Sequence, residues 1–232
     1  MDQAEEQRLR EAASWAVARG SLLFHLDLAA AIARDHVAAN GLALDTDGWA
    51  VDVGPNGYEV AFLADEPDEE LLAVTFAADG SPIAERRSGA PSRRQRALAA
   101  AARTAAALPG PERRSVVVVP PAADAAPDAA VEAYVLRLAD RPGDMALGVH
   151  TRLSLSPNGR RVLASEPLSR SPLVVEGSEG GPPVDVTVTH LLGPAPSEAH
   201  VYLSLKHGVP LSVVTADNEE HWVVDGERVS LL

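Results

Sequence analysis

The sequence predicts an α+β protein built from two units, each of which joins helix to antiparallel sheet. Three observations support this fold class. Helical periodicity marks the N-terminus and residues 93–108, short apolar runs are separated by turn dipeptides, and 46% hydrophobic residues in a chain of 232 suffice for a buried core. The Ser-Gly-Ala-Pro-Ser segment at 88–92 separates the units, so we expect domains at 1–88 and 89–232.

The first unit is predicted to begin with helix and continue as a meander. Apolar side chains recur at helical spacing on both sides of Gly20-Ser21, which suggests two helices, with Ser21 capping the second and Asn40-Gly41 ending it. The dipeptides Asp47-Gly48, Asn56-Gly57 and Asp79-Gly80 supply the tight turns that follow. The expected strands are Trp49 to Val53, Tyr58 to Leu63, Leu71 to Ala77 and a short fourth one through Ile83.

The second unit is predicted to start with an alanine-rich helix from Arg93 to Leu108, which Pro109-Gly110 ends. Asn158-Gly159 predicts a hairpin turn, and residues 167–183 read as a surface loop because they are rich in Pro, Ser and Gly. The strands expected here are Ser115 to Val119, Ala133 to Ala139, Met145 to Ser156 and Arg160 to Ser165.

C-terminal strands are expected to extend this second sheet. Alternation of apolar and polar residues predicts a strand from Val184 to His190. Residues 198–206 allow a helix, with Ser197 as N-cap and Gly208 after its end, but their period-2 pattern favours a strand. The remaining predicted strands are Leu211 to Thr215, Trp222 to Val224 and Arg228 to Leu231.

The runs Trp49-Ala50-Val51-Asp52-Val53, Gly57-Tyr58-Glu59-Val60-Ala61-Phe62 and Ala73 to Gly80, placed after a helix, resemble the αβββ pattern of PepSY-type domains over residues 25 to 87. The turn that follows the last strand in those domains is shortened here to Ala78-Asp79-Gly80, and the resemblance implies topology alone. An internal duplication also stays open, because Val74, Phe76, Gly80 and Ile83 stand 79 residues before Leu153, Leu155, Gly159 and Val162.

Composition excludes several classes of function. The chain has no cysteine, which rules out disulfides, thiol catalysis and cysteine-ligated metals. A net charge of −13 disfavours binding to nucleic acid and to anionic membranes. The acidic N-terminus lacks the basic segment of a signal peptide, so a cytoplasmic protein is expected. Arginine supplies 19 of the 20 basic residues, which with the alanine-rich segments suggests a GC-rich bacterial genome.

Motifs for catalysis are missing, and we predict no catalytic residue, cofactor or metal. There is no P-loop, no G-x-G-x-x-G, no G-x-S-x-G elbow and no H-E-x-x-H. An alternative is a hydrolase or metal-binding protein that uses the C-terminal cluster of His190, His200, His207 and His221 with Asp185, Glu198, Glu219 and Glu220. Structural roles are favoured, because His190 shares the apolar register of its strand and His200 falls on the polar register of its own expected strand.

Charge along the chain suggests a different function. Residues 51–80 hold eight acids and no base, whereas residues 81–115 hold eight arginines and two acids. The two segments either pack against each other or the acidic one meets a partner. We therefore expect a non-catalytic protein-binding module, for example an immunity-type or regulatory protein, with a basic protein partner at Asp65, Glu66, Asp68, Glu69 and Glu70. Homo-oligomerisation through an exposed strand edge stays open.

Overall fold

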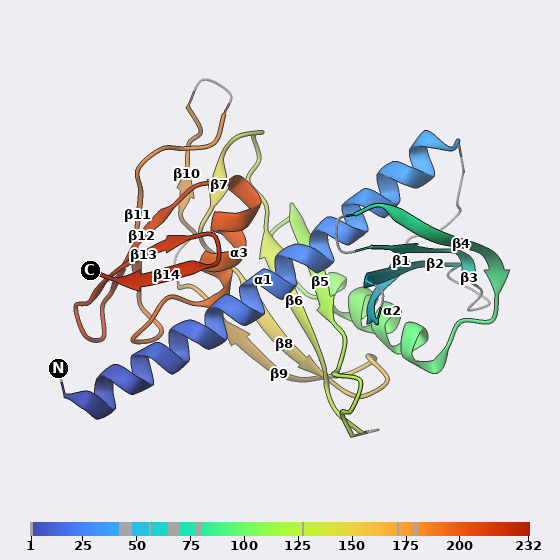
Figure 1. Ribbon diagram of the computed structural model, residues 1–232, viewed down its shortest axis with the longest axis horizontal. Coiled ribbons are helices and arrows are strands. Elements are labelled where there is room, and N and C mark those ends of the chain that lie inside the picture. The colour runs from blue at the N-terminus through green and yellow to red at the C-terminus, as the bar shows by residue number, and fades with distance from the viewer. Residues whose placement is uncertain are drawn as a thin grey trace.

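The computed structural model describes residues 2–41, 48–55, 57–64, 70–77, 80–126, 128–170, 172–178 and 181–232. These residues form three helices, three four-stranded sheets and one two-stranded pair, which confirms the α+β class. Helix α1 (Gln3–Ala39) crosses the whole molecule as a diagonal, with the first sheet at its C-terminal half and the third sheet at its N-terminal half (Figure 1).

The first sheet is the predicted antiparallel meander, and its fourth strand is present. It contains β1 (Gly48–Gly54), β2 (Gly57–Leu63), β3 (Glu70–Phe76) and β4 (Pro82–Gly89) in that order. One face of this sheet packs on α1 and the other contributes small residues to a core around α2 (Arg93–Ala106). Strand β1 is an edge strand of this sheet, and it contacts both α1 and α2.

The second sheet is also antiparallel and follows α2 as predicted. Its order is β5-β6-β8-β9, with β5 (Arg114–Val119), β6 (Val131–Arg137), β8 (Thr151–Leu155) and β9 (Val162–Pro167). Strand β5 is therefore a sheet edge and packs on α1. A small pair formed by β7 (Met145–Ala146) and β10 (Val174–Val175) stands beside it.

The C-terminal strands form a third sheet instead of extending the second one, so that prediction was wrong. The prediction of a strand at residues 198–206 was also wrong. Residues 198–206 lie in helix α3 (Glu198–His207), and this helix connects β11 (Val186–His190) to a parallel neighbour, β12 (Leu211–Thr215). The sheet is completed by β13 (His221–Asp225) and β14 (Arg228–Leu231), both antiparallel. The period-2 pattern misled because α3 is buried almost all round, so its polar residues point inward too.

Two further local predictions need correction. The N-terminal helix is continuous, and Gly20-Ser21 lies inside it, while Asn40 and Gly41 end it as expected. The expected strand Met145 to Ser156 is split into β7 and β8, because Val149 adopts a positive φ of 64° and the backbone bends before His150.

Candidate functional site

The predicted acidic partner surface falls on a part of the chain that the structure leaves undescribed. Asp65, Glu66, Asp68 and Glu69 lie outside the described residues, and Glu70 begins β3 with its side chain also outside them. Other acids of the same segment do pack against the arginine-rich one: Arg94 Nε donates to Asp52 Oδ2 at 2.7 Å, and Gln95 Nε2 donates to Glu59 at 2.9 Å.

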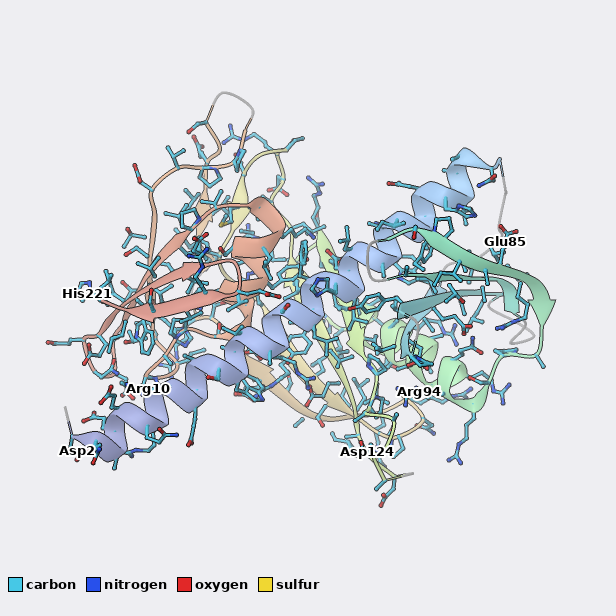
Figure 2. The ribbon with its side chains drawn as sticks, viewed as in Figure 1. Asp2, Arg10, Glu85, Arg94, Asp124 and His221 are labelled. Carbon is cyan, nitrogen blue, oxygen red and sulfur yellow. The ribbon has the colours of Figure 1, made fainter. Side chains whose placement is uncertain are left out.

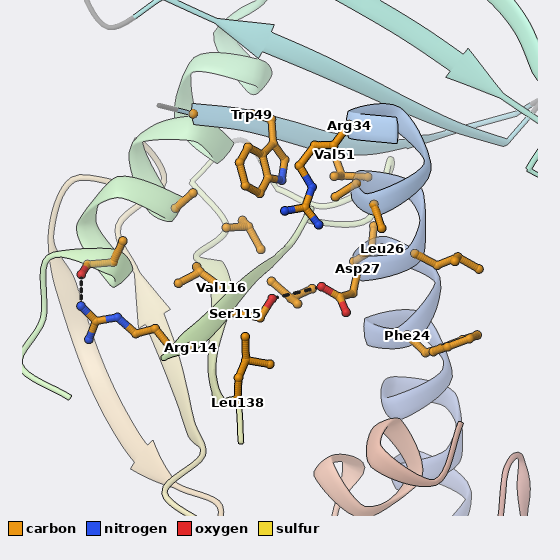
Figure 3. A pocket seen from close by; sticks show the side chains of 18 of the residues that line it. Phe24, Leu26, Asp27, Arg34, Trp49, Val51, Arg114, Ser115, Val116 and Leu138 are labelled. Atoms are coloured by element: carbon orange, nitrogen blue, oxygen red, sulfur yellow. Dashed lines mark hydrogen bonds between the residues drawn. The ribbon is translucent and has the colours of Figure 1, made fainter. Parts of the chain in front are cut away.

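A cleft of about 650 Å³ lies between α1 and β5, and β1 and α2 close its other sides (Figure 3). Its walls are mainly apolar, and its polar groups gather at the ends. The apolar lining comes from Phe24, Leu26, Leu28, Ala30 and Ala31 of α1, Trp49 and Val51 of β1, Ala102 and Ala106 of α2, Val116, Val117 and Val118 of β5, and Leu138. Volume and lining match those of small-molecule sites in proteins.

One end of the cleft is a hydrogen-bonded cluster around Asp27 of α1. Its carboxylate accepts from Ser115 Oγ at 3.0 Å, Tyr202 Oη at 2.8 Å and Lys206 Nζ at 2.7 Å. Burial raises the pKa of Asp27, but the Lys206 charge and these three hydrogen bonds outweigh it and hold the pKa below the usual 3.8. Burial and the Asp27 charge raise the pKa of Tyr202, so the phenol stays protonated.

Arginines line other parts of the cleft. Arg34 lies two helical turns beyond Asp27 on the same face of α1, and its guanidinium carbon stands 5.3 Å from the centroid of the Trp49 ring. Within the described chain Arg34 makes no hydrogen bond or ion pair. Arg114 donates to the carbonyl oxygens of Ala106 at 2.5 Å and Leu108 at 2.8 Å, and Arg103 lines the same wall.

A second hollow, of about 830 Å³, lies between the first half of α1 and the strands β13 and β14. Its charged lining is balanced, with Glu6 and Glu227 against Arg10 and Arg228. Arg10 is engaged by Glu6 one turn away, and Figure 2 shows it near the exposed start of α1. This hollow shows no preference for the charge of a ligand, and we do not assign it a function.

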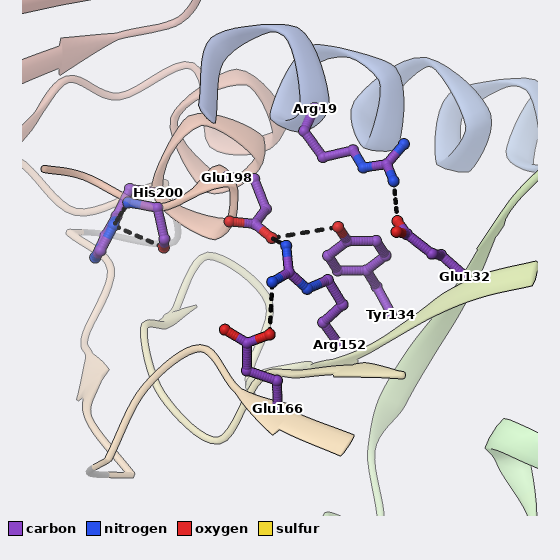
Figure 4. Close-up of polar contacts among 8 residues, drawn as sticks. Arg19, Glu132, Tyr134, Arg152, Glu166, Glu198 and His200 are labelled. Atoms are coloured by element: carbon purple, nitrogen blue, oxygen red, sulfur yellow. Dashed lines mark hydrogen bonds and ion pairs between the residues drawn. The ribbon is translucent and has the colours of Figure 1, made fainter. Parts of the chain in front are cut away.

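A buried polar network joins α3 to the second sheet (Figure 4). Glu198 Oε1 accepts from Tyr134 Oη at 3.2 Å and from Arg152 at 3.3 Å, and Arg152 also reaches Glu166 at 2.5 Å. Burial raises the pKa of Glu198, and burial together with the Glu198 charge raises the pKa of Tyr134 to about 12. Arg19 of α1 pairs with Glu132 at the edge of this network. Each of these groups has a hydrogen-bond or ion-pair partner within the protein, so we interpret the network as structural: it fixes α3 and α1 on the second sheet.

Three histidines are buried beside this network. The rings of His190 and His200 stand 5.0 Å apart and nearly perpendicular, which meets one part of the alternative of a C-terminal histidine site. His200 Nδ1 accepts from Ser197 N–H at 3.0 Å at the start of α3. His150 accepts from Arg137 N–H at 3.1 Å through Nδ1 and, in the tautomer this implies, donates from Nε2 to the Ala146 carbonyl at 3.0 Å. These hydrogen bonds tie the rings of His200 and His150 to the backbone.

The other members of the C-terminal cluster do not join these rings. Asp185 is exposed, Glu198 binds Tyr134 and Arg152, and His221 is exposed at the start of β13, away from these rings (Figure 2). Within the described ranges no group of three or more His, Asp or Glu side chains could hold a metal ion.

Sequence reasoning missed the residues that make the cleft. Asp27, Arg34, Trp49, Ser115 and Lys206 come from four elements, and Lys206 and Asp27 are 179 positions apart. The available signal was that Lys206 is the one lysine of the sequence. Comparison with protein-family models, curated proteins and solved structures gives no match to this chain.

Proposed function

We propose that this chain is a non-catalytic binding protein that holds a small apolar ligand in the cleft between α1 and β5. The observation that carries this proposal is the form of the cleft itself. Its apolar walls enclose about 650 Å³, and a small number of polar side chains converge on it from α1, α2, β5 and α3. Such a concave, mainly apolar site with a few fixed polar groups is the usual form of a ligand pocket.

The titratable groups at the cleft support binding rather than catalysis. Asp27 is a weak base because its pKa lies below the usual value, and it already accepts three hydrogen bonds. Ser115 donates to Asp27 and has no histidine beside it among the described lining residues. Nucleophilic catalysis by serine needs an adjacent base with a pKa near that of histidine.

A neutral fluorescent probe tests the cleft as a binding site. N-phenyl-1-naphthylamine should bind the wild-type protein with an increase in emission. Ala31→Phe places a ring in the cleft from α1 and should abolish this binding. Ala38→Phe makes the same change at an exposed position of α1 that does not line the cleft, and should leave binding unchanged. Equal binding to wild type and Ala31→Phe would overturn the proposal.

We also keep the proposal of a basic protein partner at the acidic residues 65, 66, 68, 69 and 70. Its support is the run of eight acids without a base over residues 51–80. Reversing these five charges to lysine should release partners that the wild-type protein captures from native lysate. Partners that remain bound to the reversed variant would contradict the acidic surface.

We also propose a PepSY-like topology for residues 25 to 87 and a cytoplasmic location for the protein. A helix followed by an antiparallel meander over residues 25 to 87 supports the PepSY-like outline as a description of topology. By length and composition, α1 is the one helix of the described chain that could cross a membrane; the central helix of a soluble protein passes the same test, and nine residues of α1 are buried in this fold. We therefore keep the cytoplasmic location and the bacterial origin as predictions.

A further inference from the structure

The charge of the cleft is opposite to that of the molecule. The chain carries a net charge of −13, yet the charged residues that line the cleft are four cations and one acid: Arg34, Arg103, Arg114, Lys206 and Asp27. Lys206 neutralises Asp27 through the 2.7 Å contact between their charged groups. The remaining lining charge is positive, in a protein whose acids outnumber its bases by 33 to 20.

Arg34 is the cation best placed to bind a ligand. Trp49 supports one face of its guanidinium, which orients the group at little cost in side-chain entropy. The edge of the guanidinium makes no hydrogen bond to any described part of the chain, and in Figure 3 it points into the cleft. Arg114, in contrast, already donates two hydrogen bonds to carbonyl oxygens at the end of α2.

An apolar stretch separates this arginine from the Asp27 cluster. Arg34 and Asp27 are seven residues apart on α1, which is about 10 Å along a helix axis. Ala30 and Ala31 of α1 lie between them, and Val116 lines the cleft from β5. The site thus has one cationic head position, one apolar trough and one neutralised polar end.

We propose that the ligand of this cleft is a single-chain amphiphile with a carboxylate head, which Arg34 binds while the hydrocarbon chain lies between α1 and β5. This inference rests on the proposed function and names the chemical class of its ligand. One guanidinium edge offers two parallel donors, which match the two oxygens of a carboxylate. Among the described lining residues, Arg34 is the cation whose donors aim into the cleft, and one such guanidinium matches a head group of one negative charge.

Competition against N-phenyl-1-naphthylamine tests the head group. The competitors are dodecanoate, dodecyl phosphate, dodecanol and dodecyltrimethylammonium, each below its critical micelle concentration. Dodecanoate should compete best. Arg34→Gln should weaken its competition by about 10- to 100-fold, the usual effect of losing hydrogen bonds to a charged group, and should leave dodecanol and the probe unaffected. Arg8→Gln removes the same charge from an exposed, remote position of α1 and should change nothing.

The outcomes separate this inference from the proposed function. If the probe binds in the cleft but dodecanoate competes no better than dodecanol, the cleft binds apolar ligands and the carboxylate assignment is wrong. A tenfold preference for dodecyl phosphate would also overturn the assignment in favour of a phosphate head. If the neutral probe itself does not bind, the proposed function fails, and this inference fails with it.

Discussion

Gly20 lies where α1 crosses α3, and its missing side chain sets how closely the two helices approach. A Cβ at this position would stand 2.6 Å from the carbonyl oxygen of Glu198 and 2.6 Å from the Cβ of Val201. No real side chain tolerates such distances, so the helix axes would have to separate. The glycine that the sequence suggested as a break between helices is in fact a packing residue inside one helix.

Gly20→Ala should therefore destabilise the protein by about 1–3 kcal/mol, the usual cost of overpacking a close contact. Urea unfolding followed by circular dichroism measures it. Ser21→Ala is the matched control, because Ser21 caps no helix and its hydroxyl makes one exposed contact to Glu227. The control should stay within about 0.5 kcal/mol of wild type. A larger loss at Ser21 than at Gly20 would favour a cap and two helices.

The buried histidines predict a loss of stability in mild acid. Burial lowers the pKa of His150 to about 4, and burial, with His190 and His150 close by, lowers that of His200 to about 3. Both are neutral when folded, whereas the unfolded chain protonates them near pH 6.5. Stability should thus fall as the pH drops through 6.5, by about 2 kcal/mol per histidine between pH 7 and 5.

Urea unfolding at pH 7 and pH 5 measures this loss. His200→Gln keeps an acceptor for the Ser197 N–H and removes one titrating group, so it should be less stable at pH 7 but lose less between the two pH values. An unchanged difference between pH 7 and pH 5 in this variant would show that His200 is not responsible.

At the scale of elements, α3 is the segment that changed most between expectation and structure. Its residues alternate in polarity, which is typical of a strand, but they begin after Ser197 and end at Gly208, which are helix signals. The segment forms a helix because its surroundings bury it on almost all sides, so the alternation of polarity does not separate a buried face from an exposed one. Its polar side chains find partners inside the protein: Tyr202 donates to Asp27, and Ser204 donates to the Val209 carbonyl at 2.8 Å.

Gly208 should be required for the end of α3. It adopts a left-handed φ of 65°, and nothing lies within 4 Å of a Cβ placed on it, so the cost of Gly208→Ala is conformational and should be about 1 kcal/mol. Gly193→Ala is the control, because its φ is ordinary and its Cβ would meet His190 at a normal 3.6 Å. Thermal unfolding of both variants measures the difference. Equal midpoints would contradict a left-handed cap.

The two antiparallel sheets also share an order of elements. Each follows a helix and ends in a hairpin, β3-β4 in the first and β8-β9 in the second. The residues that echo each other at a spacing of 79 fall on these hairpins: Val74 with Leu153 and Ile83 with Val162 stand in corresponding strands. This correspondence of topology keeps a duplication as a hypothesis.

At the scale of the whole molecule, α1 is the element that connects the three sheets. It packs on β14 with its first half, on α3 around its middle, and on β1, β2 and β5 with its second half (Figure 1). The larger hydrophobic core contains buried residues of α1, α3, β1, β2 and β5, and β14 packs against it. The cleft exists because β1 and β5, the edges of two different sheets, both face this helix. A ligand in the cleft would contact β1 of the first sheet, β5 of the second sheet and α1, which packs on both.

We expect the chain to unfold in one transition, even though its sequence suggests two units. Leu23 of α1 is fully buried in the shared core, and Leu23→Ala should cost about 2–5 kcal/mol. Because α1 supports both ends, hydrogen exchange should accelerate together in β2 of the first sheet and β13 of the third. Acceleration confined to one sheet, or two separate unfolding transitions, would instead support independent domains.

The sequence by itself determined part of the local structure of this protein. Helix α2, the meander of the first sheet and the C-terminal hairpin were predicted, because caps, glycine turns and alternation act between residues close in the chain. Only the tertiary structure decided the state of α3, the meeting of His190 and His200, and the cleft. Asp27, Ser115 and Lys206 are brought together by packing over almost 180 positions, and such contacts follow from the burial of whole faces, which no local pattern encodes.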